Sequence, residues 1–379
     1  MNFDLSDERQ MLQDTLRRFL NDNYSHDNIK LWGNSERGFS GDLWQQLAEL
    51  GVIGALFREH DGGYGGTGFD LALVFEELGR VGALEPLLET AILSGGLLGI
   101  AGDEDQRDLI SSIIDGRVQM ALAHAEPRSR YELSRVETTA RRVDKGYVLN
   151  GQKAVVVNAV SAHSVIVSAR TSGDIDDSEG ISLFLLPESV GGVDYRHYPL
   201  NSGGRAAELV LDNVRLDQQT LLGREGQAFE LLEQVQANAT LAICAEALGL
   251  MEAIKQLTIS YLKVRTQFGQ PIGKFQVLQH RMADVLMEIE QARSAVINLA
   301  GHLDASRHER EKHVSATKNL IGMVAKQVVE ESIQMHGGIG VTKEYELSHL
   351  VQRLVMIDHR FGDTTYHLER FIDLTAATP

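Results

Sequence analysis

One carboxylate stands inside a strongly apolar stretch of the chain. Glu246 lies in the run 241–251, flanked by Ala245 and Ala247. Aspartate and glutamate side chains are almost never fully buried alone, because an unpaired charge in an apolar medium costs free energy. Such a carboxylate is either a catalytic base, made more basic by burial, or a helix residue that reaches solvent or pairs with an arginine. The local pattern leaves both interpretations open.

Other residue types that do chemistry lack a productive spacing. The histidines His302, His308 and His313 do not have metal-ligand spacing, and no His-Glu-x-x-His or Gly-x-Ser-x-Gly motif occurs. We therefore expect no metal site. The single cysteine, Cys244, lies in the same helical pattern as Glu246 and is expected to be a buried apolar residue. The glycine-rich segment 61–68 follows a helical pattern instead of a strand, which favours a tight connection between helices over a dinucleotide-binding loop.

The bulk composition is that of an ordinary globular protein. The chain has 379 residues, 43% hydrophobic and 23% charged, with a formal net charge of -17. The negative charge argues against nucleic acid or anionic lipid as a partner. One cysteine and an acidic N-terminus without a basic, apolar leader indicate a cytoplasmic protein. The most apolar stretch, 87–101, is shorter than the ~20 residues that span a bilayer, so no membrane span is expected.

The periodicity of apolar residues changes twice along the chain. It predicts an α+β protein, mostly α, with an N-terminal helical domain (1–117), a middle antiparallel, barrel-like β domain (118–222) and a C-terminal four-helix bundle (223–379). Within the middle domain, the Asn150-Gly151 pair between apolar runs predicts a hairpin turn. The bundle helices are expected at 228–262, 276–303, 312–335 and 345–361.

Two C-terminal segments carry a family resemblance. The first, 261–276, contains Arg265 and Phe268-Gly269-Gln270-Pro271-Ile272, and resembles the Arg-x-x-Phe-Gly-x-Pro-Ile-x-x-Phe-Gln signature of the acyl-CoA dehydrogenase family. The second, 334–340, reads Gln-Met-His-Gly-Gly-Ile-Gly and is similar to the Gln-x-x-Gly-Gly-x-Gly segment of that family. Weaker matches occur at 76–80 and 150–153, so the resemblance runs in order along nearly the whole chain.

The resemblance implies both a cofactor and a reaction. Family members are tetramers that use FAD to dehydrogenate acyl-CoA thioesters at the α,β bond, and they pass electrons to an electron-transferring flavoprotein. By similarity, Arg265 and Phe268 would reach the FAD of a neighbouring subunit, where a guanidinium suits pyrophosphate. Gln334, Gly337 and Gly338 would approach the same cofactor, where missing β-carbons permit close backbone contact.

The position of the catalytic base departs from the common family pattern. Many members place a glutamate in a Tyr-Glu-Gly-Thr segment, where this chain has Phe361 in place of the glutamate. Asp363 lies two positions further on and has a shorter reach. Other members take the base from the first long helix of the bundle, which makes Glu246 the proposed base and Asp363 the alternative.

The middle domain departs as well. The family's Thr-Glu-Pro and Trp-Ile-Thr segments are replaced by Ala125-Glu126-Pro127 and Val155-Val156-Val157, which lack the threonine hydroxyl and the indole. Segments 131–142 and 361–368 look like the small subunit of pimeloyl-CoA dehydrogenase and related subunits of steroid side-chain degradation, which pair with a second family subunit. Homotetramer and heterotetramer both stay open. The alternatives to a catalytic subunit are a non-catalytic partner subunit and a flavin monooxygenase on the same fold.

Overall fold

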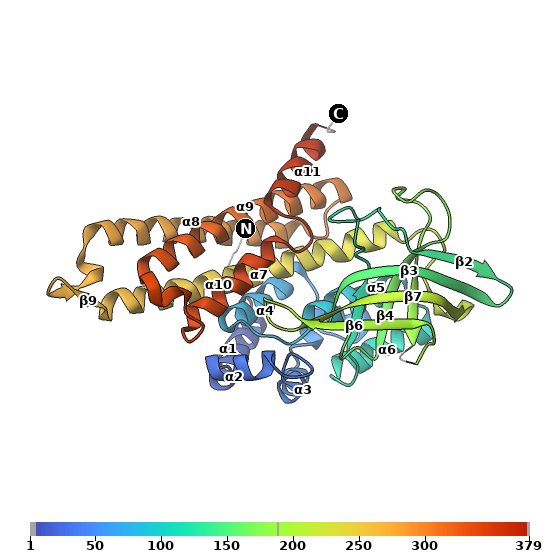
Figure 1. Ribbon diagram of the computed structural model, residues 1–379, viewed down its shortest axis with the longest axis horizontal. Coiled ribbons are helices and arrows are strands. Elements are labelled where there is room, and N and C mark those ends of the chain that lie inside the picture. The colour runs from blue at the N-terminus through green and yellow to red at the C-terminus, as the bar shows by residue number, and fades with distance from the viewer. Residues whose placement is uncertain (1–4, 188, 377–379) are drawn as a thin grey trace. The chain divides into compact units, whose positions relative to one another are not determined.

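The computed structural model describes residues 5–187 and 189–376. Its elements follow the predicted order of helices, then strands, then helices (Figure 1). The described residues pack as two compact units that each combine distant segments. A helical unit comprises the residues up to Lys30, Thr67–Ala83, and the chain from Thr240 onward. A β-containing unit comprises Leu31–Gly66 and Leu84–Ala239.

The helical unit is built around long helices of the C-terminal third. Its helices are α1 (Asp7–Asn23), α2 (His26–Gly33, up to Lys30), α4 (Gly68–Val81), α7 (Phe229–Val264, from Thr240), α8 (Gln276–His302), α9 (Arg307–His336), α10 (Glu346–Asp358) and α11 (Thr364–Ala376). Its short elements are β9 (Thr266–Gln267), β10 (Gln270–Pro271), η5 (Ile272–Lys274) and η6 (Gly337–Val341). The helix expected over 345–361 ends earlier, at Asp358, and α11 follows it as a helix that the apolar pattern had not indicated.

Helix α7 contributes one continuous buried run to the apolar core of this unit. Its run 241–251 is buried throughout, including Cys244 as expected. Among the described residues, α7 is the one helix long and apolar enough to cross a membrane by length and composition, and 89% of its most apolar window is buried inside the protein. Such burial is typical of a core helix.

Helices α4 and α7 cross at their closest approach through two glycines. A β-carbon on Gly79 would lie 2.1 Å from the carbonyl oxygen of Glu246, and one on Gly249 would lie 2.0 Å from that of Glu76. Each glycine therefore rests on the backbone of the other helix, and any larger side chain would separate the two. This contact explains why a glycine stands in the segment 76–80.

Ion pairs surround this crossing. Glu77, only 1% exposed, pairs with Arg17 at 2.5 Å, and Arg293 of α8 bridges Glu76 at 3.0 Å and Glu252 at 2.9 Å. These bonds join α1, α4, α7 and α8. Because each buried carboxylate has a cationic partner, the charges are compensated inside the bundle.

The β-containing unit holds an eight-stranded sheet in the order β6-β7-β3-β2-β4-β5-β8, with β1 paired to β4. The strands are β1 (Met120–Ala123), β2 (Thr139–Val143), β3 (Gly146–Val157), β4 (Ser164–Arg170), β5 (Ile181–Pro187), β6 (Val193–Pro199), β7 (Arg205–Asp217) and β8 (Leu221–Leu222). Its helices are α3 (Gly41–Glu49), η1 (Gly54–Leu56), η2 (Glu59–Asp61), the π-helix η3 (Leu88–Gly95), α5 (Gly96–Ala101), α6 (Glu104–Ile114) and η4 (Gln218–Thr220).

Two details of the sheet differ from the expectation. The predicted turn at Asn150-Gly151 is wrong, because these residues lie inside β3, at a register shift against β7. The hairpin instead turns at 144–145, where Val143 of β2 pairs with Gly146 of β3. The sheet is also mixed: β1 and β2 run parallel to β4, while the other pairs are antiparallel.

A buried ion pair connects β3 to the segment that contains Glu126. Lys153 is fully buried, and its Nζ donates to Glu126 Oε1 at 2.6 Å and to Ser168 Oγ at 3.0 Å. Desolvation lowers the pKa of Lys153 to about 8, although the negative charge of Glu126 acts to raise it. Glu126 also accepts backbone N–H groups of Glu137 and Thr138. The Ala125-Glu126-Pro127 segment is thereby tied to β3.

Candidate cofactor and catalytic site

The first family-like motif forms a tight hairpin at the end of α7. Arg265 donates its backbone N–H to the carbonyl of Tyr261, and its own carbonyl accepts from Ile272. Between β9 and β10 the chain turns on Phe268 and Gly269, at φ 53° and 80°. Two successive positive φ values are those of a type I′ turn, which suits glycine or asparagine and strains phenylalanine. Figure 1 shows this hairpin at the end of α7 where α8 begins.

The strained residue is also the most exposed large apolar side chain among the described residues. Phe268 is 91% exposed, and its nearest ring, that of Phe275, lies 6.1 Å away between centroids. A strained backbone and an unburied phenyl ring both cost free energy in the isolated chain. Such features persist where a function outside the fold requires them.

The second motif ends α9 in a turn that only glycine can make. Gly337 has φ 66° and ψ -146°, a combination that is essentially restricted to glycine. A β-carbon on Gly337 or on Gly338 would meet nothing within 4 Å, so the backbone there faces open space. Gln334, one turn earlier on α9, is exposed. The arrangement offers bare backbone and an exposed amide side chain to a ligand.

A stack of aromatic rings joins the two motifs. His336, directly before Gly337, stacks on Tyr261 with ring centroids 4.5 Å apart, and Tyr345 flanks it at 5.4 Å. The segment that leads into the Arg265 hairpin therefore contacts the residue directly before the glycine turn. The sequence did not single out the three rings. Their one signal was the position of His336 immediately before the first glycine.

We call the Arg265 hairpin and the Gly337–Gly338 turn together the cofactor-holding edge. Its chemistry fits a dinucleotide. An exposed guanidinium suits pyrophosphate, an exposed aromatic ring suits contact with a planar ligand, and bare glycine backbone permits close approach. The exposed residues Arg265, Phe268, Gln334, Gly337 and Gly338 supply these groups. The five residues proposed from the sequence to hold FAD thus lie on two segments that the ring stack connects.

Glu246 is buried, as its apolar neighbours suggested, and it has a cationic partner. Its side chain is 7% exposed, and its Oε1 accepts a short hydrogen bond from Nε of Arg353, which lies on α10 and is 19% exposed. The bond joins α7 to α10. A base must receive a proton from its substrate, and the contact with Arg353 occupies one of the two carboxylate oxygens that could do so. The assignment of Glu246 as the base stays a prediction.

Asp363 begins α11. Its Oδ1 accepts the backbone N–H of Tyr366 at 2.9 Å, and its carbonyl accepts that of His367, as in a helix N-cap. The turn before it is held from the interior by the buried Lys318, whose Nζ donates to the carbonyls of Asp358 at 3.0 Å and Gly362 at 2.8 Å. Asp363 thus caps a helix, and its catalytic role also stays a prediction.

Phe361 stands where many family members have the base, and its turn is closely packed. A β-carbon on Gly362, at φ 113°, would lie 2.4 Å from the Tyr366 ring and 2.6 Å from Nε2 of His367. The His367 ring is bonded to the carbonyl of Phe361 at 3.0 Å. Burial lowers the pKa of His367 to about 3, with a further contribution from the charge of Lys318. Neither Phe361 nor Gly362 offers a carboxylate at this turn.

Val155, in the segment where the resemblance expects an indole and a hydroxyl, has an unusual backbone. Val155 has φ 51° and is 52% exposed, a strained conformation for a β-branched residue. Its backbone N–H donates to Glu208 Oε1 at 3.3 Å, which also accepts the hydroxyl of Tyr198 at 2.6 Å. Burial and this carboxylate raise the pKa of Tyr198 to about 12. The missing indole and hydroxyl are therefore not replaced by another group at Val155.

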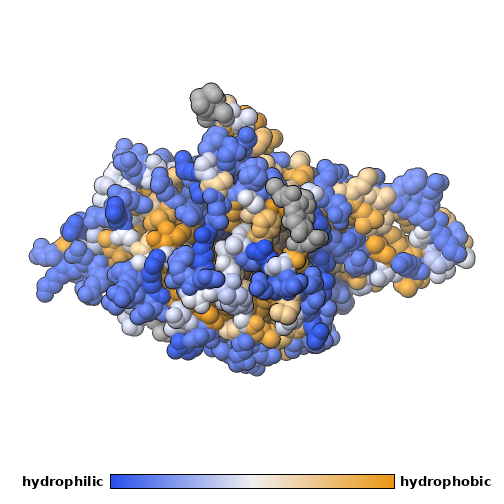
Figure 2. Space-filling view, turned by 180° about the vertical axis from the view of Figure 1, so that it is seen from behind, coloured by the Kyte–Doolittle hydropathy of each residue, from blue (hydrophilic) through white to orange (hydrophobic). Residues whose placement is uncertain are grey.

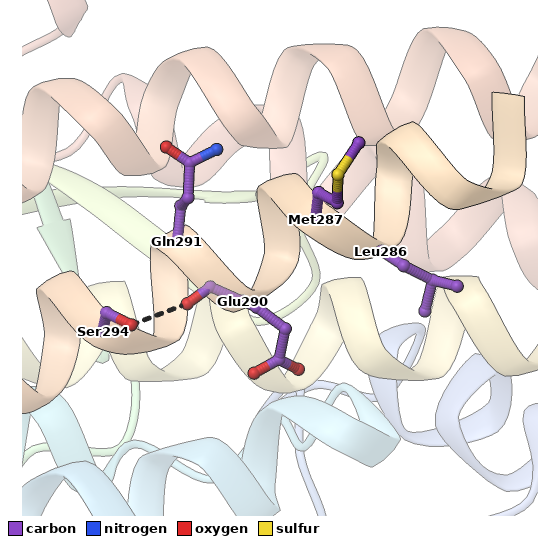
Figure 3. A pocket seen from close by; sticks show the side chains of 5 residues that line it. All are labelled: Leu286, Met287, Glu290, Gln291 and Ser294. Carbon is purple, nitrogen blue, oxygen red and sulfur yellow. Dashed lines mark hydrogen bonds between the residues drawn. The ribbon is translucent and has the colours of Figure 1, made fainter. Parts of the chain in front are cut away.

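Two shallow hollows lie away from these motifs. One, of ≈ 450 Å³, is lined by one face of α8: Leu286, Met287, Glu290, Gln291 and Ser294 (Figure 3). The hydrogen bond from Ser294 Oγ to the Glu290 carbonyl stays within the helix. The other, of ≈ 540 Å³, is polar and lies between α3 and the loops at 116–119 and 160–163. Neither hollow contains a residue of the two motifs.

The surface is mainly hydrophilic on the face that Figure 2 shows, and apolar patches lie scattered between the hydrophilic residues. Among residues 5–187 and 189–376 no cluster of histidine, cysteine, aspartate or glutamate has the geometry of a metal site.

Comparison with known proteins gives the family. Models of the N-terminal, middle and C-terminal domains of acyl-CoA dehydrogenase match residues 6–117, 121–214 and 229–370. The short-chain-specific acyl-CoA dehydrogenase of Megasphaera elsdenii is 30% identical over 82% of this chain and 83% of its own. The structure of the butyryl-CoA dehydrogenase of Megasphaera elsdenii superposes with a TM-score of 0.90, at 26% identity, over 99% of this chain and 100% of that one.

The structure of a variant of the steroid acyl-CoA dehydrogenase Tcur3481-Tcur3483 superposes with a TM-score of 0.87, at 29% identity, over 98% of both chains. The family models together match most of the chain, in the same order as the observed helices and strands. The chain belongs to the acyl-CoA dehydrogenase family, a family of FAD-dependent oxidoreductases.

Proposed function

We propose that this chain is one subunit of a tetrameric, FAD-dependent acyl-CoA dehydrogenase and that it helps to hold the FAD of a neighbouring subunit. The observation that carries the proposal is Phe268, a phenyl ring that is 91% exposed on a strained turn, while the Gly337–Gly338 turn likewise leaves its backbone bare. Neither feature benefits the isolated chain. Both suit a cofactor that arrives with a second subunit.

Within this proposal each residue has a distinct task. The Arg265 guanidinium pairs with the pyrophosphate, the Phe268 ring covers an apolar part of the cofactor, and Gln334 hydrogen-bonds to a polar edge. The Gly337–Gly338 backbone lies against the cofactor because no β-carbon intervenes. Bound FAD would supply the acceptor for the β-hydride of the acyl-CoA, with electrons passing on to an electron-transferring flavoprotein.

The catalytic base distinguishes two forms of the proposal. In the first, which the contacts of Glu246 with Arg353 and of Asp363 with Tyr366 favour, this chain supplies no base and a second family subunit does. The enzyme is then a heterotetramer. The similarity to the Tcur3481-Tcur3483 steroid acyl-CoA dehydrogenase, whose name joins two proteins, supports this form and points to a steroid-derived acyl group.

The second form is a self-sufficient dehydrogenase in which Glu246 removes the α-proton. The placement of Glu246 favours it, because this carboxylate is buried within the apolar run of the first long helix of the C-terminal domain. In that form Arg353 orients Glu246 through Oε1, and the other carboxylate oxygen receives the proton. Glu246→Gln would then abolish exchange of the α-proton of bound acyl-CoA with solvent.

Expression alone and together with a family subunit encoded beside it separates the two forms. The heteromeric form predicts a colourless chain when it is purified alone, and a complex of two different chains with flavin absorbance when both are expressed. Flavin absorbance and native mass are the measurements. A stoichiometric flavin spectrum from the lone chain would exclude the heteromeric form, and a colourless complex would contradict the proposal as a whole.

A further inference from the structure

His336 has an environment that its own hydrogen bonds do not explain. The residue is 4% exposed, and its Nδ1 lies 2.8 Å from the carbonyl of Ser332, one turn earlier on α9. A carbonyl only accepts, so Nδ1 carries the proton and, in the neutral ring, Nε2 is an acceptor. That Nε2 is buried and has no hydrogen-bond partner among the described residues. A single hydrogen bond within α9 thus orients the ring, and no described polar group contacts its other nitrogen.

Two ring contacts hold the His336 side chain in addition to this hydrogen bond. Tyr261, at the end of α7, stacks on one side of His336 with an interplanar angle of 26°, and Tyr345, just before α10, packs against it at 54°. The turn after α9 folds directly over the same residue, since a β-carbon on Gly340 would lie 3.1 Å from Cβ of His336. Three separate segments of the helical unit thus meet at a single imidazole.

Those segments are the ones that lead into the cofactor-holding edge. The carbonyl of Tyr261 accepts the backbone N–H of Arg265, so the tyrosine and the start of the hairpin are a single rigid piece. His336 immediately precedes Gly337, so its ring fixes where the glycine turn begins. A shift of the imidazole would move Arg265 and Gly337 relative to each other.

We propose that His336 is a positioning residue for the cofactor: its ring locks the Arg265 hairpin and the Gly337–Gly338 turn in the one relative placement from which both reach the same FAD. This inference rests on the proposed function, because it presupposes that both segments hold FAD. It adds a role for a residue that does not itself touch the cofactor. An aromatic ring at position 336 is required, and its nitrogens are not.

Two substitutions separate the ring from its nitrogens. His336→Phe keeps a flat ring between Tyr261 and Tyr345 and removes both nitrogens, whereas His336→Ala removes the stack. Each variant is made in the flavin-containing assembly, which is the complex with the second family subunit where the chain alone is colourless. Release of FAD on dilution is followed by flavin fluorescence, alongside the far-UV circular dichroism of the same samples. His280→Ala, on an exposed face of α8, is the matched control.

The expected result is at least a roughly tenfold faster or more complete release of FAD from His336→Ala, and release within about threefold of the unmodified protein from His336→Phe and His280→Ala. Circular dichroism is expected to stay unchanged in all three. Unchanged release from His336→Ala, equal loss in His336→Phe, or lost helicity in step with lost flavin would overturn the inference. Arg265→Ala tests the proposed function separately: if it too releases no FAD, the proposed function fails, and if it alone releases FAD, only the role of His336 fails.

Discussion

The pairing of Glu246 with Arg353 allows a test of whether the buried carboxylate is structural or catalytic. Glu246→Gln removes the negative charge and leaves the shape. Breaking a buried ion pair by removing one partner costs about 3–5 kcal/mol. Because the Arg353 side chain is 19% exposed and retains some hydration, we expect a smaller loss, about 2–3 kcal/mol of unfolding free energy for the helical unit.

The assay is a double-mutant cycle in urea. Glu246→Gln, Arg353→Met and the double variant are unfolded with the helical signal as the probe, and the coupling energy is expected to exceed about 1 kcal/mol. The matched control is Glu330→Gln, which alters an exposed pair with Lys326 on α9 and should cost less than about 0.5 kcal/mol. A coupling near zero, together with lost α-proton exchange in Glu246→Gln, would refute the structural interpretation and identify Glu246 as the base.

Further predictions concern the turns and the buried charges. Phe268→Asn should fit the positive φ at least as well as phenylalanine, leaving stability unchanged or higher while the complex loses FAD, measured by urea unfolding and flavin absorbance. Gly337→Ala should cost about 1–3 kcal/mol and release FAD, because its φ and ψ suit only glycine. His367, with its pKa lowered to about 3, is neutral in the fold and protonated below about pH 6.5 when unfolded, so stability is full above that pH and falls by up to about 1.4 kcal/mol per pH unit toward pH 3; His367→Gln should flatten this slope in a pH series of unfolding curves. Lys153→Met should lower the free energy of unfolding by about 3–5 kcal/mol, since Glu126 would be left as a buried charge without its cation, and Lys153→Met combined with Glu126→Gln should recover part of the loss in thermal unfolding.

The order of helices and strands was predictable because it depends on local periodicity. The apolar stripe of α7 and the break after it at Gly269 and Pro271 specify a long helix followed by a tight loop. The prediction of a turn at Asn150-Gly151 was wrong because of contacts between strands that lie apart in the sequence. Sheet pairing with β7 on one side and β2 on the other extends β3 through these residues, so tertiary contacts overrode a strong local preference.

The candidate site was predictable only in part. The two glycine-containing motifs pointed to Arg265, Phe268 and Gly337. The structure adds that Phe268 and Gly337 both have positive φ angles, which the motifs alone do not reveal. That the motifs meet through His336 depends on packing between helix ends that lie far apart in the chain. The partner of Glu246 was equally invisible, because Arg353 lies 107 residues away.

The packing of α4 on α7 is another feature that could not be predicted from local sequence. Glycine costs about 1 kcal/mol relative to alanine within a helix, so helix propensity alone gives no reason for Gly79 and Gly249. The structure shows each of them pressed against a carbonyl of the opposite helix. Their requirement comes from a close approach of two backbones, which no single segment of sequence encodes.

The measurement that tests the account most directly is the FAD content of the assembled protein carrying Arg265→Ala, read together with its native mass. Loss of one charge-assisted contact to pyrophosphate should weaken FAD binding by about 1.5–3 kcal/mol, or roughly 10- to 100-fold. We predict that Arg265→Ala keeps the mass of the assembly and loses most of its flavin absorbance. Full flavin occupancy in an intact assembly would contradict the claim that this chain holds the cofactor.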